Sequence, residues 1–133
     1  MHALLKTAMK AAAPAIAVMA LAGPASAHHA FNMFALDQVV TVQGTVKTYD
    51  FKMPHVWVYV VTQGKAGPEE WGFEAHSPNL VARKGWNMTT LKAGDKITLR
   101  MHPMKDGTKA GSLIDVTLAD GRNLWNAQSL SQP

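Results

Sequence analysis

Two adjacent histidines, His28 and His29, follow a segment that ends in small residues, and they have the greatest chemical potential in the sequence. If the chain is cut after Ala27, His28 becomes the first residue, and its free amine and imidazole can chelate a divalent metal together. His29 offers a competing chelate through its amide and ring. Imidazole nitrogen suits Cu(II), which ranks highest among the first-row divalent metals. One or two further imidazoles would complete the site, so we expect a copper-binding protein.

The rest of the chain supplies further side chains that could bind this metal. They are three histidines and two methionines, namely His55, His76, His102, Met101 and Met104. Thioether sulfur selects Cu(I), whereas imidazole also accepts Cu(II). Each residue also has a structural interpretation, because a histidine can bond to a neighbouring carbonyl or to Glu74, and a methionine can fill the core.

Residues 1–27 are typical of a cleaved export signal. Lys6 and Lys10 precede an apolar stretch, and Ala25-Ser-Ala27 fits the small-x-small rule of a signal peptidase site. A membrane anchor is the alternative, but the apolar stretch is shorter than the roughly 20 residues that cross a bilayer. We therefore expect a bacterial periplasmic or secreted protein without stable membrane insertion. Cleavage after Ala25 is a second possibility, and it would place His28 third in an amino-terminal copper-binding motif.

Composition excludes several classes of function. The chain has no cysteine, which rules out disulfides, thiol chemistry and cysteine-based zinc or iron-sulfur sites. Loss of Lys6 and Lys10 with the signal removes two of the four net positive charges. A chain this weakly basic, with no run of lysine or arginine, does not fit a nucleic-acid partner. No nucleophile-base pair or phosphate loop indicates catalysis, so we expect a binding protein and not an enzyme.

Alternation of apolar and polar residues predicts five strands in a domain spanning residues 39–121. The expected strands are residues 39–50, 55–61, 69–76, 96–102 and 112–118. In the second strand, the alternating Val56, Val58 and Val60 should face the core. Gly44 in the first strand suggests a bulge or a sharp bend.

A single short helix is expected between the third and fourth strands, because Ser77-Pro78 favours a helix start and Gly85 a stop. This order of elements indicates an all-β, five-stranded OB-fold-like Greek-key barrel. A small β-sandwich is the alternative. The N-terminal segment 28–38 precedes the barrel, and the tail 122–133 follows it and could pack back on it or stay mobile.

Ligands of OB-type barrels usually meet the outward face of the second and third strands. Here that face carries Trp57, Tyr59 and Glu74 in addition to His55 and His76. Exposed aromatic rings can stack on a ligand. The alternative function is therefore a module that binds an organic or glycan ligand, or a cell-envelope protein, through this aromatic strand face.

Two resemblances to known families add to these expectations. The landmarks of the first are His28-His-Ala-Phe31, Pro54-His-Val-Trp57, Ser77-Pro-Asn79 and Arg83-Lys-Gly-Trp86. They resemble a family of small exported bacterial proteins of unknown function, which implies no activity. The segments Gly44-Thr-Val-Lys47 and Leu91-Lys-Ala-Gly-Asp95 are similar to those of the periplasmic Cus-type copper and silver chaperones. That resemblance implies an OB-fold that binds Cu(I) through one His, two Met and a capping Trp, although the chaperones' Trp-Pro-x-Met-x-Met strand is absent here.

Overall fold

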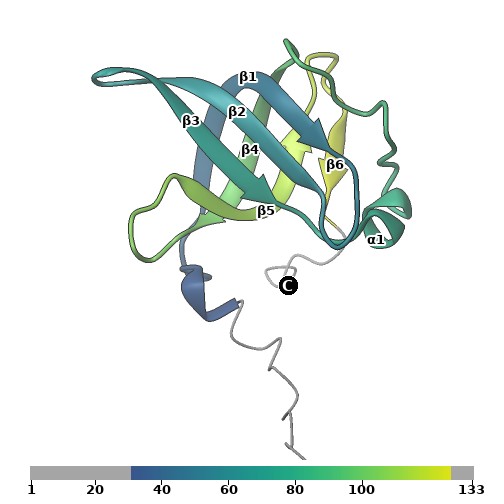
Figure 1. Ribbon diagram of the computed structural model, residues 1–133, viewed down its shortest axis with the longest axis horizontal. Helices are drawn as coiled ribbons and strands as arrows, with labels where there is room; N and C mark the ends of the chain where they lie inside the picture. Colours follow the sequence, from purple (N-terminus) through teal and green to yellow (C-terminus); the bar gives the residue numbers. More distant parts are fainter. Residues whose placement is uncertain (1–30, 127–133) are drawn as a thin grey trace, which may run out of the picture.

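The computed structural model describes residues 31–126, whose strands curl into a barrel (Figure 1). The strands in chain order are β1 (Val40–Asp50), β2 (Trp57–Gly64), β3 (Gly67–Glu74), β4 (Lys96–Pro103), β5 (Ala110–Thr117) and β6 (Asn123–Trp125). Their order in the sheet is β3-β2-β1-β4-β5-β6, and β3 also pairs in parallel with β5. This last pairing closes the first five strands. The five-stranded Greek-key barrel is thereby confirmed, and the β-sandwich alternative is wrong.

The valine face of β2 lies at the centre of the core, as the alternation predicts. Val56, Val58 and Val60 are fully buried and belong to one apolar cluster with Phe73 of β3 and Leu99 of β4. Burying an aliphatic side chain of this size contributes about 1.5–3 kcal/mol to folding. Because successive side chains of a strand point to opposite faces, the core fixes which residues of β2 face outward.

Gly44 is not the bulge that its position suggests. The register of β1 against β2 shifts further along, between Val46 and Thr48. At Gly44 the two strands approach so closely that an added Cβ would lie 2.8 Å from the carbonyl oxygen of Val61. The next residue, Thr45, pairs with both β2 and β4. Glycine is therefore needed where β1 passes from one partner strand to the other.

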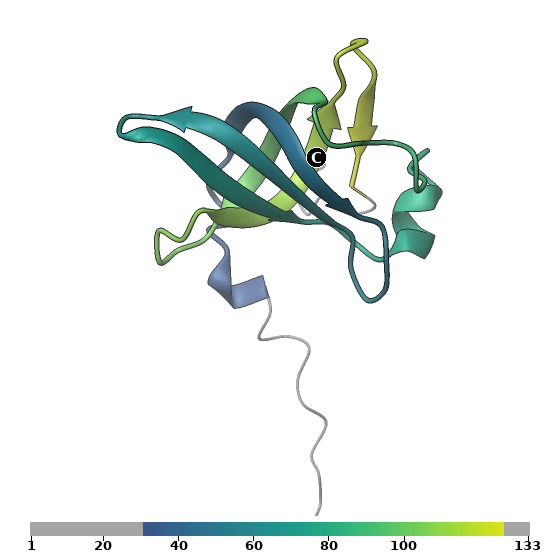
Figure 2. The same ribbon diagram turned by 45° about the horizontal axis from the view of Figure 1, so that its top comes forward.

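The hairpin of β2 and β3 extends further than predicted and projects from the barrel (Figures 1 and 2). Its residues Gly64 and Gly67, which resemble a loop in the sequence, pair with each other. Only Lys65 and Ala66 separate the two strands, and Gly67 has a φ of +121°, which favours glycine. Both strands therefore lie closer to the turn than predicted. β2 starts at Trp57, not at residue 55, and β3 ends at Glu74, not at residue 76.

The helix α1 (Pro78–Ala82) lies between β3 and β4, where the sequence predicts it. Pro78 occupies its start, and Gly85, with a φ of +92°, follows its end. Ser77 precedes the helix but makes no capping hydrogen bond through its side chain. Within residues 31–126, no helix has the length and apolar character required to span a membrane.

Two segments outside the five strands pack against the barrel. The first part of the predicted tail forms β6, which pairs antiparallel with the second half of β5. Before β1, Phe34 and Ala35 are buried, and Phe34 forms a β-bridge with Met104. Figure 2 shows the preceding 3-10 turn, Phe31–Met33, beside the loop that joins β4 to β5.

Candidate functional site

The predicted barrel histidines lie at or near strand ends, and two of them are close in the fold, because the carbonyl of His76 accepts a hydrogen bond from the amide of Val56, the residue after His55 (3.1 Å). His55 precedes β2, His76 follows β3, and His102 lies near the end of β4. His28 and His29 lie outside the described residues. Within residues 31–126, no three His, Asp or Glu side chains are grouped so that they could hold a metal. A metal site on any of these histidines therefore needs ligands of another kind or from another part of the chain.

His102 differs from the other two because its ring is almost fully enclosed, with only 4% of the residue exposed. Its Nδ1 lies 2.8 Å from the carbonyl oxygen of Gln38. Since a carbonyl can only accept, Nδ1 carries the proton and donates, and Nε2 of the neutral ring is left as an acceptor. Nε2 is buried and has no hydrogen-bond partner in the described part of the protein.

The enclosure of His102 comes from the segment before β1. This segment runs along the end of β4, where the amide of Ala35 donates to the carbonyl of Pro103 (2.8 Å) and the amide of Lys105 donates to that of Met33 (2.9 Å). Together with the Phe34–Met104 bridge, these bonds attach residues 33–35 next to His102. The chain toward His28 therefore leaves the barrel close to this histidine.

The two predicted methionine ligands have different environments. Met101 is fully buried in the core, as its inward position in β4 predicts. Its thioether packs against Gly111 of β5, where an added Cβ would collide with it. Met101 thus fills the core beneath a glycine. Met104 is half-buried directly after β4, and its backbone forms the bridge with Phe34 two residues from His102.

His55 lies at the surface and contacts a carboxylate. Its Nδ1 is 2.5 Å from Oε1 of Glu74, and the two side chains are 46% and 26% exposed. His76 follows β3, and its backbone amide donates to Oδ1 of Asn126 (2.8 Å). His55 thus makes the bond to Glu74 that the sequence indicated as the alternative to metal binding.

The predicted ligand face of β2 and β3 contains two aromatic rings that lie nearly parallel. The centroids of Trp57 and Tyr59 are 5.9 Å apart, and their planes differ by 13°. Both rings lean over Gly72 of β3, where an added Cβ would lie 3.2 Å from Tyr59 and 3.8 Å from Trp57. We call Trp57, Tyr59 and Gly72 the aromatic face. Glu74, opposite Trp57 in the register, borders it.

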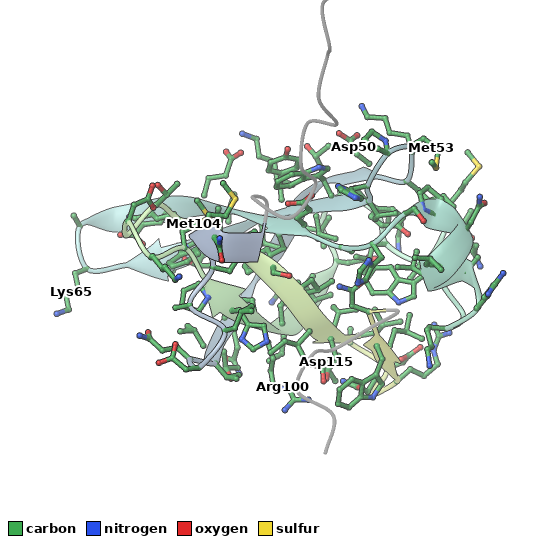
Figure 3. All side chains as sticks on the ribbon, turned by 90° about the horizontal axis from the view of Figure 1, so that it is seen from below. Asp50, Met53, Lys65, Arg100, Met104 and Asp115 are labelled. Carbon is green, nitrogen blue, oxygen red and sulfur yellow. The ribbon has the colours of Figure 1, made fainter. Side chains whose placement is uncertain are left out.

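Sequence reasoning missed a charged pair on the outer surface of β4 and β5. Arg100 and the buried carboxylate of Asp115 form a bidentate ion pair, and Trp125 of β6 lies 5.3 Å from the guanidinium (Figure 3). The hydrogen bonds that Arg100 donates to Asp115 raise the pKa of Arg100 above its ordinary value. Asp115 could have indicated this pair from the sequence, because a carboxylate inside an apolar strand requires a partner. The pair holds β6 against the barrel.

An open groove of about 720 Å³ lies at the end of the barrel where β4 begins and β5 ends. Its polar lining consists mostly of uncharged side chains, among them Gln43, Thr45, Thr98 and Thr117, with Lys96 as a cation. None of the predicted ligand residues lines it.

Comparison with known proteins identifies a family but no activity. A model of the family of unknown function DUF6152 matches residues 15–113, about three quarters of the chain. No curated protein and no solved structure matches the sequence or the fold significantly. The resemblance to the Cus-type chaperones thus has no support from these comparisons. The match over most of the barrel shows that the chain belongs to the DUF6152 family of unknown function.

Proposed function

We propose that this protein is an exported binding protein that holds one Cu(II) ion between its processed N-terminus and His102. The observation that carries the proposal is the buried Nε2 of His102, which lacks a partner among residues 31–126. Leaving a buried acceptor unpaired costs about 1–3 kcal/mol. Such an atom in a native fold requires an explanation, and a metal ion is one that also fits the sequence.

The surroundings of the ring support a role as metal ligand. Histidines that bind metals usually donate their second ring N–H to a carbonyl or carboxylate, which fixes the tautomer and the orientation of the ring. His102 makes this bond to Gln38. The lone pair of Nε2 is consequently available without any change of tautomer.

The path of the chain favours His102 over His55 as the barrel ligand. Six peptide bonds join His28 to Phe34, so the two residues lie at most about 20 Å apart. Phe34 bridges Met104, only two residues from His102. His55 instead precedes β2, which β1 separates from β4 in the sheet. The amine and ring of His28 therefore have a shorter path to His102.

The proposed ligands are the amine and imidazole of His28 and Nε2 of His102. The amide and ring of His29 are an alternative N-terminal chelate. Met104, two residues from His102 in the chain, is a further candidate ligand, and its thioether would retain the ion after reduction because sulfur suits Cu(I).

The test is a Cu(II) titration of the untagged, processed protein, with calorimetry and electron paramagnetic resonance. We expect about one Cu(II) per chain with a nitrogen-rich signal. His102→Asn retains an amide donor close to the position of Nδ1 but removes Nε2, so it should weaken binding at least tenfold. His55→Ala is the matched control and should bind like the native protein.

An N-terminal extension of a few residues tests the other half of the site without touching the barrel. It converts the chelating amine into an amide, so binding should weaken while unfolding by urea stays unchanged. Equal Cu(II) affinity of the native, extended and His102→Asn proteins would show that the proposal is wrong.

A further inference from the structure

We infer that the aromatic face and the two carboxylates beside it form a separate site for an organic cation, such as a substituted ammonium group. The site consists of Trp57 and Tyr59 on β2, Asp50 on β1 and Glu74 on β3. It requires neither His102 nor the N-terminus, so it does not depend on the proposed copper site.

The two rings form a platform that the sheet holds in place. They lie within 13° of parallel and rest over Gly72, whose lack of a side chain lets them approach β3. The valines on the opposite face of β2 are fully buried, so the backbone beneath the rings is fixed by the core. A ligand would meet a preformed surface and would not have to order it.

Carboxylates flank this platform on both sides. In the register, Trp57 lies opposite Asp50 of β1 and opposite Glu74 of β3. Side chains directly opposite one another on neighbouring strands have Cβ atoms about 5 Å apart. Asp50 and Glu74 are 34% and 26% exposed, and their present partners are Lys52 at 3.3 Å and His55 at 2.5 Å. Both carboxylates can therefore face a ligand that lies on the Trp57 ring.

This combination selects for positive charge. The faces of aromatic rings carry negative potential and attract cations, Trp most strongly, with a gain of about 0.5–2 kcal/mol. Asp50 and Glu74 add attraction for a cation and repel an anion. In the described part of the chain, the aromatic ring that has a cation over its face is Trp125, and the cation is Arg100. Figure 3 shows Arg100 on the opposite side of the barrel from Asp50. No described lysine or arginine thus covers the aromatic face.

The test compares two probes of equal shape, choline and its uncharged analogue 3,3-dimethylbutanol, on copper-free protein. Binding is followed by the NMR shift of the Trp57 indole, assigned with Trp57→Leu. We expect choline to bind at least tenfold more tightly than the neutral analogue, since only the charge distinguishes them. Equal affinities for the two probes, or binding of a neutral sugar in preference to choline, would overturn the proposal.

Charge-neutral variants identify the residues responsible. Glu74→Gln and Asp50→Asn should each weaken choline binding at least threefold without affecting the fold. Glu70→Gln is the matched control, because Glu70 is on the same face but is paired with Lys47 (2.5 Å) away from Trp57. His102→Asn should bind choline normally, which separates this site from the copper site. Choline binding that survives loss of both Asp50 and Glu74 charges would contradict the inference.

Discussion

Tyr49 is the described residue whose acid-base behaviour the fold alters most clearly. Its hydroxyl donates to the carbonyl of Asn87 (2.8 Å), and its ring packs against Phe51 and Trp86. Burial disfavours the phenolate and raises the pKa of Tyr49 to about 12, although a hydrogen bond with Thr90 acts in the opposite direction. In the unfolded chain a tyrosine ionises near pH 10.

This difference predicts a loss of stability in alkali. Because the unfolded chain releases the proton first, the contribution of Tyr49 is complete below pH 10 and is lost as the pH rises toward 12. Tyr49→Phe should therefore show a smaller decrease in the urea midpoint between pH 9 and 11 than the native protein. In parallel, the difference in absorbance at 295 nm between the two proteins should titrate near 12. A midpoint near 10 would show that Tyr49 is not shielded.

His102 shows how far residue patterns predict the candidate site. Alternation in β4 correctly puts Met101 in the core, and the same alternation would turn the next residue, His102, outward. The structure buries His102 because residues 34–38 cover it from outside the barrel. That segment has no periodic pattern, so its position could not be predicted. Its only signal is the pair of apolar residues Phe34 and Ala35.

At the scale of elements, Asn126 lies where β5 changes its pairing partner from β3 to β6. Its amide Nδ2 donates to the carbonyl of Leu113 (2.7 Å), its Oδ1 accepts from the amide of His76, and its own backbone amide donates to Ile114 (2.9 Å). It is only 4% exposed. One side chain thus satisfies backbone groups that neither strand can pair at this point.

Asn126→Ala should destabilise the fold by about 2 kcal/mol, because it leaves the carbonyl of Leu113 and the amide of His76 without these bonds. Asn123→Ala is the control, since Asn123 is exposed and bonds only to the hydroxyl of Thr117 through its side chain (3.0 Å). The control should change the stability by less than about 0.5 kcal/mol. Urea unfolding of the mature domain measures both. Equal losses for the two variants would mean that the junction does not depend on Asn126.

Alternation predicted the elements more reliably than their ends. The five long strands have one buried face each, and this period is visible in residues such as Ile97, Leu99 and Met101. The ends of β2 and β3 were missed because glycine and proline in a pairing hairpin look like a loop. β6 has only three residues, too few for a period, and it is stabilised by Arg100 and by the bond from Trp86 to the carbonyl of Trp125.

At the scale of the whole molecule, the fold could be predicted from the order of five strands and one helix. The pairing of β3 with β5 closes the barrel. A parallel contact between strands this far apart leaves no local mark in the sequence, but it follows once five strands and one helix are arranged as a Greek key. The residues of each strand that can meet a ligand are then those on the face opposite the core. The sequence left the flanking segments open, because the tail could pack back on the barrel or stay mobile and the segment before β1 had no predicted position.

The proposed copper site depends on the N-terminal flanking segment, because the chelate forms only if the N-terminus is processed. We expect the intact mass of exported protein to correspond to a chain that begins at His28, since Ala25-Ser-Ala27 fits a signal peptidase site.

A chain that begins at Ser26 would still bind Cu(II), but His28 would then be the third residue. The terminal amine, the amides and the ring of His28 would supply the ligands, so His102→Asn should have little effect. An uncleaved chain has no amine near His28, so it should show the weak binding of the extended protein. Mass and Cu(II) affinity measured on the same preparation therefore distinguish these three molecules, and strong binding by an uncleaved chain would exclude the N-terminal chelate.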